Sequence, residues 1–176
     1  MDMVQIWPHG ENFTDNAAFE SLYYRSFPAN ELRELSELMV DRSGAVEFIA
    51  LYEEGIFTGF MTLLITRKIA HIIYFAIEDA LRGRGCGSRA LSAAAERYPD
   101  RRIIVDVELP VDTAPNRPER EKRMAFYIHN GYAETEVRYN WRGEDYVILS
   151  YGGPVTEQDW NDFWQELNEV PNLELF

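Results

Sequence analysis

The spacing of hydrophobic residues predicts two helices followed by three strands in the first half of the chain. Apolar side chains recur at helical spacing after Thr14, which is placed to cap that helix, and again over residues 32–39. The following segments are rich in β-branched and aromatic residues and predict strands over 46–52, 56–66 and 69–77. Because only short turns separate these strands, we expect an antiparallel meander.

The second half alternates between helices and strands. An alanine-rich helix ends at Pro99 and a second helix covers 119–129, and strands are predicted over 103–109, 133–141 and 146–151. Strand–helix–strand units that follow a meander predict an α/β fold (α+β mixed sheet) with helices on both faces of the sheet.

A final helix, capped by Thr156, carries a stripe of large apolar side chains: Trp160, Phe163, Trp164 and Leu167. Such a stripe packs in a core or in a homodimer interface, or it forms a wall of a substrate pocket. We therefore expect one domain over 1–153, with 154–176 as a C-terminal helical extension packed on the same domain.

Composition narrows the class of protein. The 176 residues are 46% hydrophobic, enough for an ordinary core, and the formal net charge is −13, which disfavours binding to nucleic acid. One cysteine excludes an internal disulfide, and the scattered histidines, at positions 9, 71 and 129, lack metal-ligand spacing, so we expect no metal. The chain has no membrane-spanning apolar run and does not start like a signal peptide, which predicts a cytoplasmic protein without a membrane partner.

The charge is unevenly distributed along the chain. Residues 82–123 contain ten basic and seven acidic side chains, a local charge of +3, which leaves −16 on the rest. Solvated helix faces would explain such a distribution. A local site for an anionic ligand would explain it equally well.

The stretch Arg82-Gly83-Arg84-Gly85-Cys86-Gly87-Ser88 follows a predicted strand and opens a helix. Glycines allow backbone N–H groups to converge, and a helix N-terminus favours phosphate, so this stretch suits a pyrophosphate with Arg82 and Arg84 as countercharges. It lacks the Gly-Lys-Ser/Thr of a P-loop, and Ser88 stands where the Rossmann fingerprint needs glycine. An ordinary glycine-rich turn is the alternative.

The spacing Arg/Gln-x-x-Gly-x-Gly/Ala fits this stretch and resembles the pyrophosphate loop of the GNAT acyltransferase superfamily. Residues 123–132, which contain Phe126-Tyr127 followed by Gly131-Tyr132, are similar to the helix of that family that ends in Phe/Leu-Tyr-x-x-x-Gly-Phe/Tyr. Ile56–Phe60 looks like its third strand. The resemblance covers residues 15 to 151 and implies a GNAT-like fold with a splayed central strand pair.

The resemblance implies an N-acetyltransferase that moves an acetyl group from acetyl-coenzyme A to a primary amine of a small molecule or protein, by direct attack in a ternary complex. The strands over 69–77 and 103–109 would splay around the coenzyme. An N–H near Ile77 would stabilise the thioester oxyanion. The implied coenzyme-binding residues are Phe75, Ala76 and Ile77 for the pantetheine arm, and Arg82, Gly83, Arg84, Gly85, Cys86, Gly87 and Ser88 for the pyrophosphate.

Tyr127 occupies the general-acid position of the family, and a phenol can protonate the leaving thiolate. Arg120 and Arg123 share its helix face by spacing, so nearby cations are expected to ease phenolate formation. The alternative is a tyrosine packed on the helix with its hydroxyl at the surface.

For the general base we choose Glu108, acting directly or through a water. Asp106 and Glu108 alternate with valines on one strand, so both carboxylates point to the same face, and Glu108 lies nearer the carboxyl end of the strand. Glu78 and Asp106 are the rivals. A salt bridge from Glu108 to the arginines of the following helix is the structural alternative.

Two departures from the family pattern affect the prediction. Arg120 stands where the family often has asparagine, and the loop before the tyrosine helix is longer than usual. The replaced asparagine, together with the rival candidates for the base, leaves open a non-catalytic acyl-CoA-binding regulatory module. Cys86 at a helix start invites a nucleophile interpretation, which we disfavour because the family usually has a small apolar residue there and no histidine is near in sequence.

Overall fold

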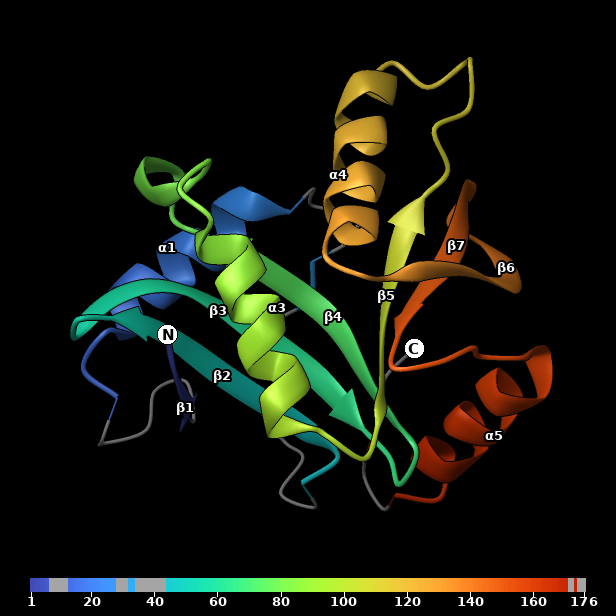
Figure 1. Cartoon of the computed structure of the whole chain (residues 1–176), viewed down its shortest axis with the longest axis horizontal. Coiled ribbons are helices and arrows are strands. Elements are labelled where there is room, and N and C mark those ends of the chain that lie inside the picture. Colours follow the sequence, from blue (N-terminus) through green and yellow to red (C-terminus); the bar gives the residue numbers. More distant parts are fainter. Residues whose placement is uncertain (7–12, 28–31, 34–43, 171–172, 174–176) are drawn as a thin grey trace.

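The computed structural model (Figure 1) describes residues 1–6, 13–27, 32–33, 44–170 and 173. Seven strands form one sheet in the order β1-β2-β3-β4-β5-β7-β6. The strands are β1 (Asp2–Ile6), β2 (Val46–Glu53), β3 (Ile56–Ile65), β4 (Ile69–Ile77), β5 (Arg102–Glu108), β6 (Ala133–Trp141) and β7 (Glu144–Tyr151). All neighbours pair antiparallel except β4 and β5, which confirms the predicted mixed sheet.

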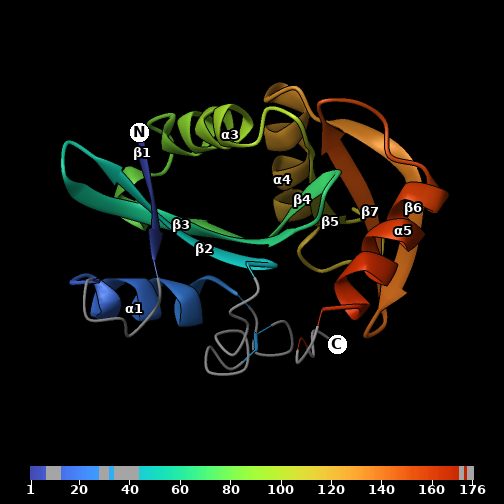
Figure 2. The ribbon, with the colours of Figure 1, turned by 90° about the horizontal axis from the view of Figure 1, so that it is seen from below.

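Helices cover both faces of this sheet, as predicted. They are α1 (Asn16–Ser26), α3 (Cys86–Arg97), α4 (Arg117–His129) and α5 (Glu157–Asn168), with a 3-10 turn at Asp79–Leu81. Figure 2 shows α1 and α3 on opposite faces. Two apolar clusters lie on the two sides of the sheet, one holding side chains of α1 and α5, the other those of α3 and α4. No helix in the described ranges is long and apolar enough to cross a membrane.

Several predicted boundaries need correction. β1 was not predicted, because only Ile6 of its five residues is buried and no apolar alternation marks it. Thr14 does not cap α1, which begins after Asp15, and the Asp15 carboxylate instead accepts a hydrogen bond from the Tyr52 hydroxyl. α3 begins at Cys86, so the end of the glycine-rich stretch forms its first turn. The helix expected over 32–39 lies almost entirely outside the described residues.

The parallel strands β4 and β5 pair only along their first halves. The register runs from Ile69 opposite Arg102 to Ile72 opposite Val105 and then stops, and Figure 1 shows the strands diverging beyond that point. A bulge on β4 coincides with the separation, because Ile73 has no partner on β3, and bulges bend strands. The predicted splayed pair is therefore present, and none of the strands that the structure describes pairs with the later part of β4 on its β5 side.

The connection from β5 through α4 leads to β6, which lies at the edge of the sheet and not beside β5. After α4 the chain forms β6, and β7 then returns antiparallel between β5 and β6. Because β7 lies between β5 and β6, it pairs with β5 as far as Glu108. The carboxyl end of β5 is therefore hydrogen-bonded to β7, whereas no described strand pairs with it on the β4 side.

α5 packs on the same sheet. Thr156 and Asp159 form a capping box at its start, as the sequence predicts for Thr156. Arg102 at the start of β5 holds Asp159 with two hydrogen bonds of 2.8 Å and keeps the pKa of that carboxyl well below its usual range. Phe163 and Leu167 are buried in the core.

Candidate active site

The glycine-rich loop adopts the backbone that its composition predicts. Gly83 and Gly85 have φ of +73° and +78°, in the left-handed region that favours glycine, and Gly85 is the N-cap of α3. Arg82 Nε donates to the Ile77 carbonyl oxygen at 3.2 Å, which ties the loop to the end of β4. The Arg84 side chain forms no hydrogen bond or ion pair with the described residues, so its charge is available to an anion.

Gly87 allows three elements to meet at the start of α3. A Cβ at this position would lie 3.0 Å from Phe126 Cζ on α4 and 3.9 Å from Phe75 Cζ on β4. Such a contact is tighter than ordinary van der Waals packing, so any larger residue would displace the Phe126 ring.

Gly59 holds β3 close to β4 beside the split, a structural role that the sequence analysis did not assign to it. It pairs with Ile77 across β3 and β4, and a Cβ there would lie 2.2 Å from the Ala76 carbonyl oxygen. Only glycine lets the backbones of β3 and β4 approach this closely. The signal in the sequence was an isolated glycine inside a strand pattern, which indicates close backbone approach.

Tyr127 on α4 is 8% exposed, and its hydroxyl has no hydrogen-bond partner among the residues that the structure describes. Burial raises its pKa to about 12, Arg123 opposes that shift, and Asp106 adds to it. The expected easing of phenolate formation by nearby cations is therefore outweighed by desolvation. A phenol that holds its proton at neutral pH suits a general acid.

Glu108 lies at the end of β5 and is 7% exposed. Its Oε1 is 3.1 Å from Arg120 Nη2, and its Oε2 is 2.7 Å from Arg123 Nη1. The salt bridge to the following helix is thus formed. Guanidinium groups occupy both carboxylate oxygens of Glu108, so its role as base stays a prediction that this geometry does not favour.

Arg120, at the position where the family often has asparagine, is a buried hub with 3% exposure. Besides Glu108 it pairs with Glu144 at 2.9 Å, and it donates to the Leu109 carbonyl oxygen at 3.1 Å and to Asn116 Oδ1 at 2.7 Å. The Arg120 side chain therefore connects the start of α4 to the end of β5 and the start of β7.

The rival bases differ in their surroundings. Glu78 forms an ion pair with Arg25 of α1. Asp106 Oδ2 lies 2.8 Å from His71 Nε2 on β4, and His71 is 2% exposed. The sequence did not indicate this pair, because the two residues are neighbours only through the pairing of β4 with β5.

Cys86 is buried, and its sulfur lies 3.4 Å from Glu53 Oε2 and 3.2 Å from Arg89 Nη2. Burial and the neighbouring Glu53 raise the pKa of the thiol. This environment opposes a nucleophilic role.

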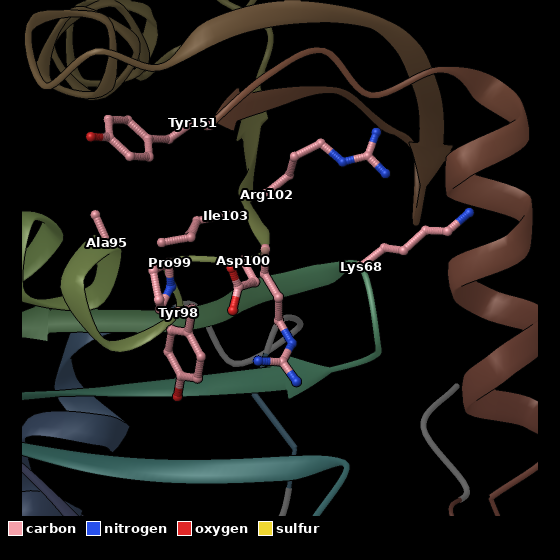
Figure 3. Close-up of a pocket in the computed structure, with 10 residues that line it drawn as sticks. Lys68, Ala95, Tyr98, Pro99, Asp100, Arg102, Ile103 and Tyr151 are labelled. Atoms are coloured by element: carbon pink, nitrogen blue, oxygen red, sulfur yellow. The ribbon is translucent and has the colours of Figure 1, made fainter.

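A cavity of about 380 Å³ lies at the other end of the sheet, around the end of α3 and the start of β5. It contains none of the predicted site residues. Figure 3 shows the charged groups of Lys68 and Arg102 directed away from Tyr98 and Tyr151, so these cations do not converge on a ligand. The lining is Lys68, Ala95, Tyr98, Pro99, Asp100, Arg101, Arg102, Ile103, Tyr151 and Gly152.

The structure combines a parallel strand pair that splays, a glycine loop at the end of one strand and a buried tyrosine on the helix after the other, which are the features that the resemblance implies. The model of the acetyltransferase (GNAT) family matches residues 16–132, about two thirds of the chain. The chain belongs to the GNAT family, and it is an acyltransferase of that family.

Solved structures of this family share the fold. A GNAT-family protein from Bacteroides thetaiotaomicron is 24% identical with a TM-score of 0.79, and the match covers 99% of this chain and 100% of that chain. The ribosomal-protein-S18-alanine N-acetyltransferase from Escherichia coli is 15% identical with a TM-score of 0.59, covering 90% and 97%. A GNAT acetyltransferase from Elizabethkingia anophelis with acetyl-CoA bound is 13% identical with a TM-score of 0.53, covering 84% and 96%. These identities show the fold alone, and no protein of curated function matches the sequence.

Proposed function

We propose that the protein is an N-acetyltransferase that moves an acetyl group from acetyl-coenzyme A to a primary amine of a small molecule or protein. The observation that carries the proposal is the split between β4 and β5, with the glycine loop tied to the end of β4. Membership of the GNAT family and the acetyl-CoA bound to the Elizabethkingia relative support it.

The residues around the split fit the coenzyme. Between Ile73 and Ile77, β4 faces β5 with a strand edge that no described strand pairs, so the amides of a pantetheine arm can add to it, with Phe75, Ala76 and Ile77 as partners. The loop from Arg82 to Ser88 offers the N-terminus of α3 and the unpaired Arg84 to the pyrophosphate.

In the reaction the amine nitrogen attacks the thioester carbonyl, a C–N bond forms and the C–S bond breaks. Tyr127 gives its proton to the leaving thiolate, and an N–H near Ile77 stabilises the oxyanion. The nitrogen must lose two protons on the way from ammonium to amide, so a base is required. Glu108 is the base predicted from sequence, although both of its oxygens are ion-paired.

The test measures the release of free coenzyme thiol from acetyl-CoA by purified protein. The acceptor panel contains aliphatic and aromatic monoamines, a polyamine, an aminoglycoside, a lysine-containing peptide and a peptide with a free N-terminus. We expect a thermal shift with acetyl-CoA and thiol release with at least one amine. A thermal shift without release across the panel would favour a non-catalytic acyl-CoA-binding module, which the ion-paired Glu108 also favours. The absence of both effects would refute the proposal.

The role of the glycine-rich loop can be tested at Gly83, with Gly143, in the turn between β6 and β7, as the matched control. Both have left-handed φ, +73° and +88°, and a Cβ at either would meet nothing within 4 Å. Each glycine-to-alanine change should cost about 1 kcal/mol of stability through backbone strain. Only Gly83→Ala should also weaken coenzyme A binding, by about tenfold, because it reorients N–H groups of the loop. Calorimetry of both variants checks this, and equal affinities would contradict the role of the loop.

A further inference from the structure

His71 and Asp106 lie where β4 and β5 part. His71 is opposite Ile104 in the parallel register, and Asp106 is two residues further along β5 on the same face. Strand pairing ends at the next register position, between Ile72 and Val105. The bond between His71 Nε2 and Asp106 Oδ2, 2.8 Å long, therefore crosses the base of the split.

Each of these two side chains has one buried atom that no described residue bonds. Asp106 Oδ1 and His71 Nδ1 form no hydrogen bond with the residues that the structure describes. The histidine ring lies among aromatic rings, 5.6 Å from both Trp160 and Phe163 between centroids. With no acceptor near Nδ1, the tautomer that fits this environment carries its proton on Nε2 and donates it to Asp106. Asp106 Oδ2 then accepts this hydrogen bond, and Oδ1 is left to accept a hydrogen bond from another donor.

Aromatic side chains form a row beside this carboxylate. Tyr146 on β7 lies diagonally across from Asp106 on the same face of the sheet. Its ring stacks on Tyr139 at 5.3 Å, and Tyr139 stacks on Trp160, which reaches His71. These rings stack on one another, so the feature that suits an ammonium group is the carboxylate oxygen without a partner among the described residues, which attracts the opposite charge.

Asp106 also differs from Glu108 in how many of its carboxylate oxygens are bonded by described residues. Both oxygens of Glu108 are held by guanidinium groups, whereas only one oxygen of Asp106 is bound. The Asp106 carboxylate acts electrostatically on the phenol of Tyr127. Tyr127 belongs to the apolar cluster of α3 and α4, whereas Asp106 shares the face of Ile104, which belongs to the cluster of α1 and α5. The two groups thus flank the split from opposite faces of the sheet.

We propose that Asp106, oriented by His71, receives the protonated primary amine of the acceptor and takes its proton. This inference rests on the proposed acetyltransferase function. Asp106 Oδ1 accepts a proton from the ammonium group, and the neutral amine attacks the thioester. The second proton of the nitrogen returns to Tyr127 after Tyr127 has protonated the thiolate. The products are the N-acetyl amide, the coenzyme thiol and one proton that leaves Asp106 for solvent. His71 is a positioning residue.

The kinetic test uses the amine of the panel that gives the fastest thiol release. Asp106→Asn should lower kcat by about 100-fold and leave the KM for acetyl-CoA within about twofold. His71→Gln should keep most of kcat, because its amide N–H can still donate to Asp106, whereas His71→Leu should lose about tenfold or more. Asp162→Asn, an exposed carboxylate on α5, is the control that should match the wild type.

If Asp106→Asn does not fold, nuclear magnetic resonance of His71 tests the inference without that variant. With His9 and His129 replaced by glutamine, ¹⁵N-labelled His71 is the only imidazole signal. It should show the Nε2-protonated tautomer and shift when the same amine is added to the coenzyme A complex, but not with the corresponding alcohol. Wild-type kcat in Asp106→Asn, equal losses in both His71 variants, or an Nδ1-protonated tautomer would overturn the inference. Absence of thiol release by the wild type would instead refute the proposed function.

Discussion

Replacing Arg120 with methionine should lower the free energy of unfolding by about 3–5 kcal/mol, the cost of breaking a buried ion pair by removing one partner. The Arg120 side chain is 4% exposed and bonds Glu108, Glu144, the Leu109 carbonyl oxygen and Asn116. Methionine fills the space but leaves Glu108 buried with Arg123 as its remaining cation. The Leu109 carbonyl and Asn116 also lose a donor.

Urea denaturation of Arg120→Met measures this effect against Arg117→Met as a control. Arg117 lies on the same helix and pairs with Asp112 and Glu121, but its side chain is 44% exposed. Exposed pairs contribute about 0–1 kcal/mol, so the control should change stability by no more than that. Similar losses in both variants would contradict the assignment of Arg120 as the hub of this cluster.

Changing Tyr127 to phenylalanine should lower kcat by about 10²–10⁴-fold while the affinity for coenzyme A changes by less than about twofold. The variant keeps the packed ring and removes only the hydroxyl that is proposed to protonate the thiolate. Burial raises the pKa of Tyr127 to about 12, so the phenol stays protonated at neutral pH. The rate should therefore show no loss from its ionisation until the pH approaches that value.

Tyr132 offers a close control for this experiment. Its ring lies 5.5 Å from that of Tyr127, its hydroxyl is buried without a partner among the described residues, and burial raises its pKa as well. Tyr132→Phe also deletes a buried hydroxyl, so it should leave kcat unchanged and stability equal or slightly higher. Thiol-release kinetics of the two variants compare them directly. Full activity in Tyr127→Phe would refute its role as the acid.

Local rules of the sequence were enough for much of the fold. The glycine stretch after a strand and before a helix predicted the loop of Gly83 and Gly85, because positive φ depends on the residue itself and its neighbours. The same is true of Thr156, whose capping box uses only residues within one turn. β1 lacked such a signal, since its strand character comes from pairing with β2, more than forty residues later.

The sequence by itself determined the order of most elements, the glycine-rich loop and the acidic, basic and phenolic groups available for chemistry. Only the tertiary structure decided which partners each carboxylate has. Glu108 is ion-paired with Arg120 and Arg123 from α4, and Glu78 with Arg25 from α1. Asp106 bonds His71 through one oxygen, and its other oxygen has no partner among the described residues. Alternation along β5 gives Asp106 and Glu108 the same face, but whether a carboxylate can accept a proton depends on charges brought to it by other elements, which local spacing does not contain.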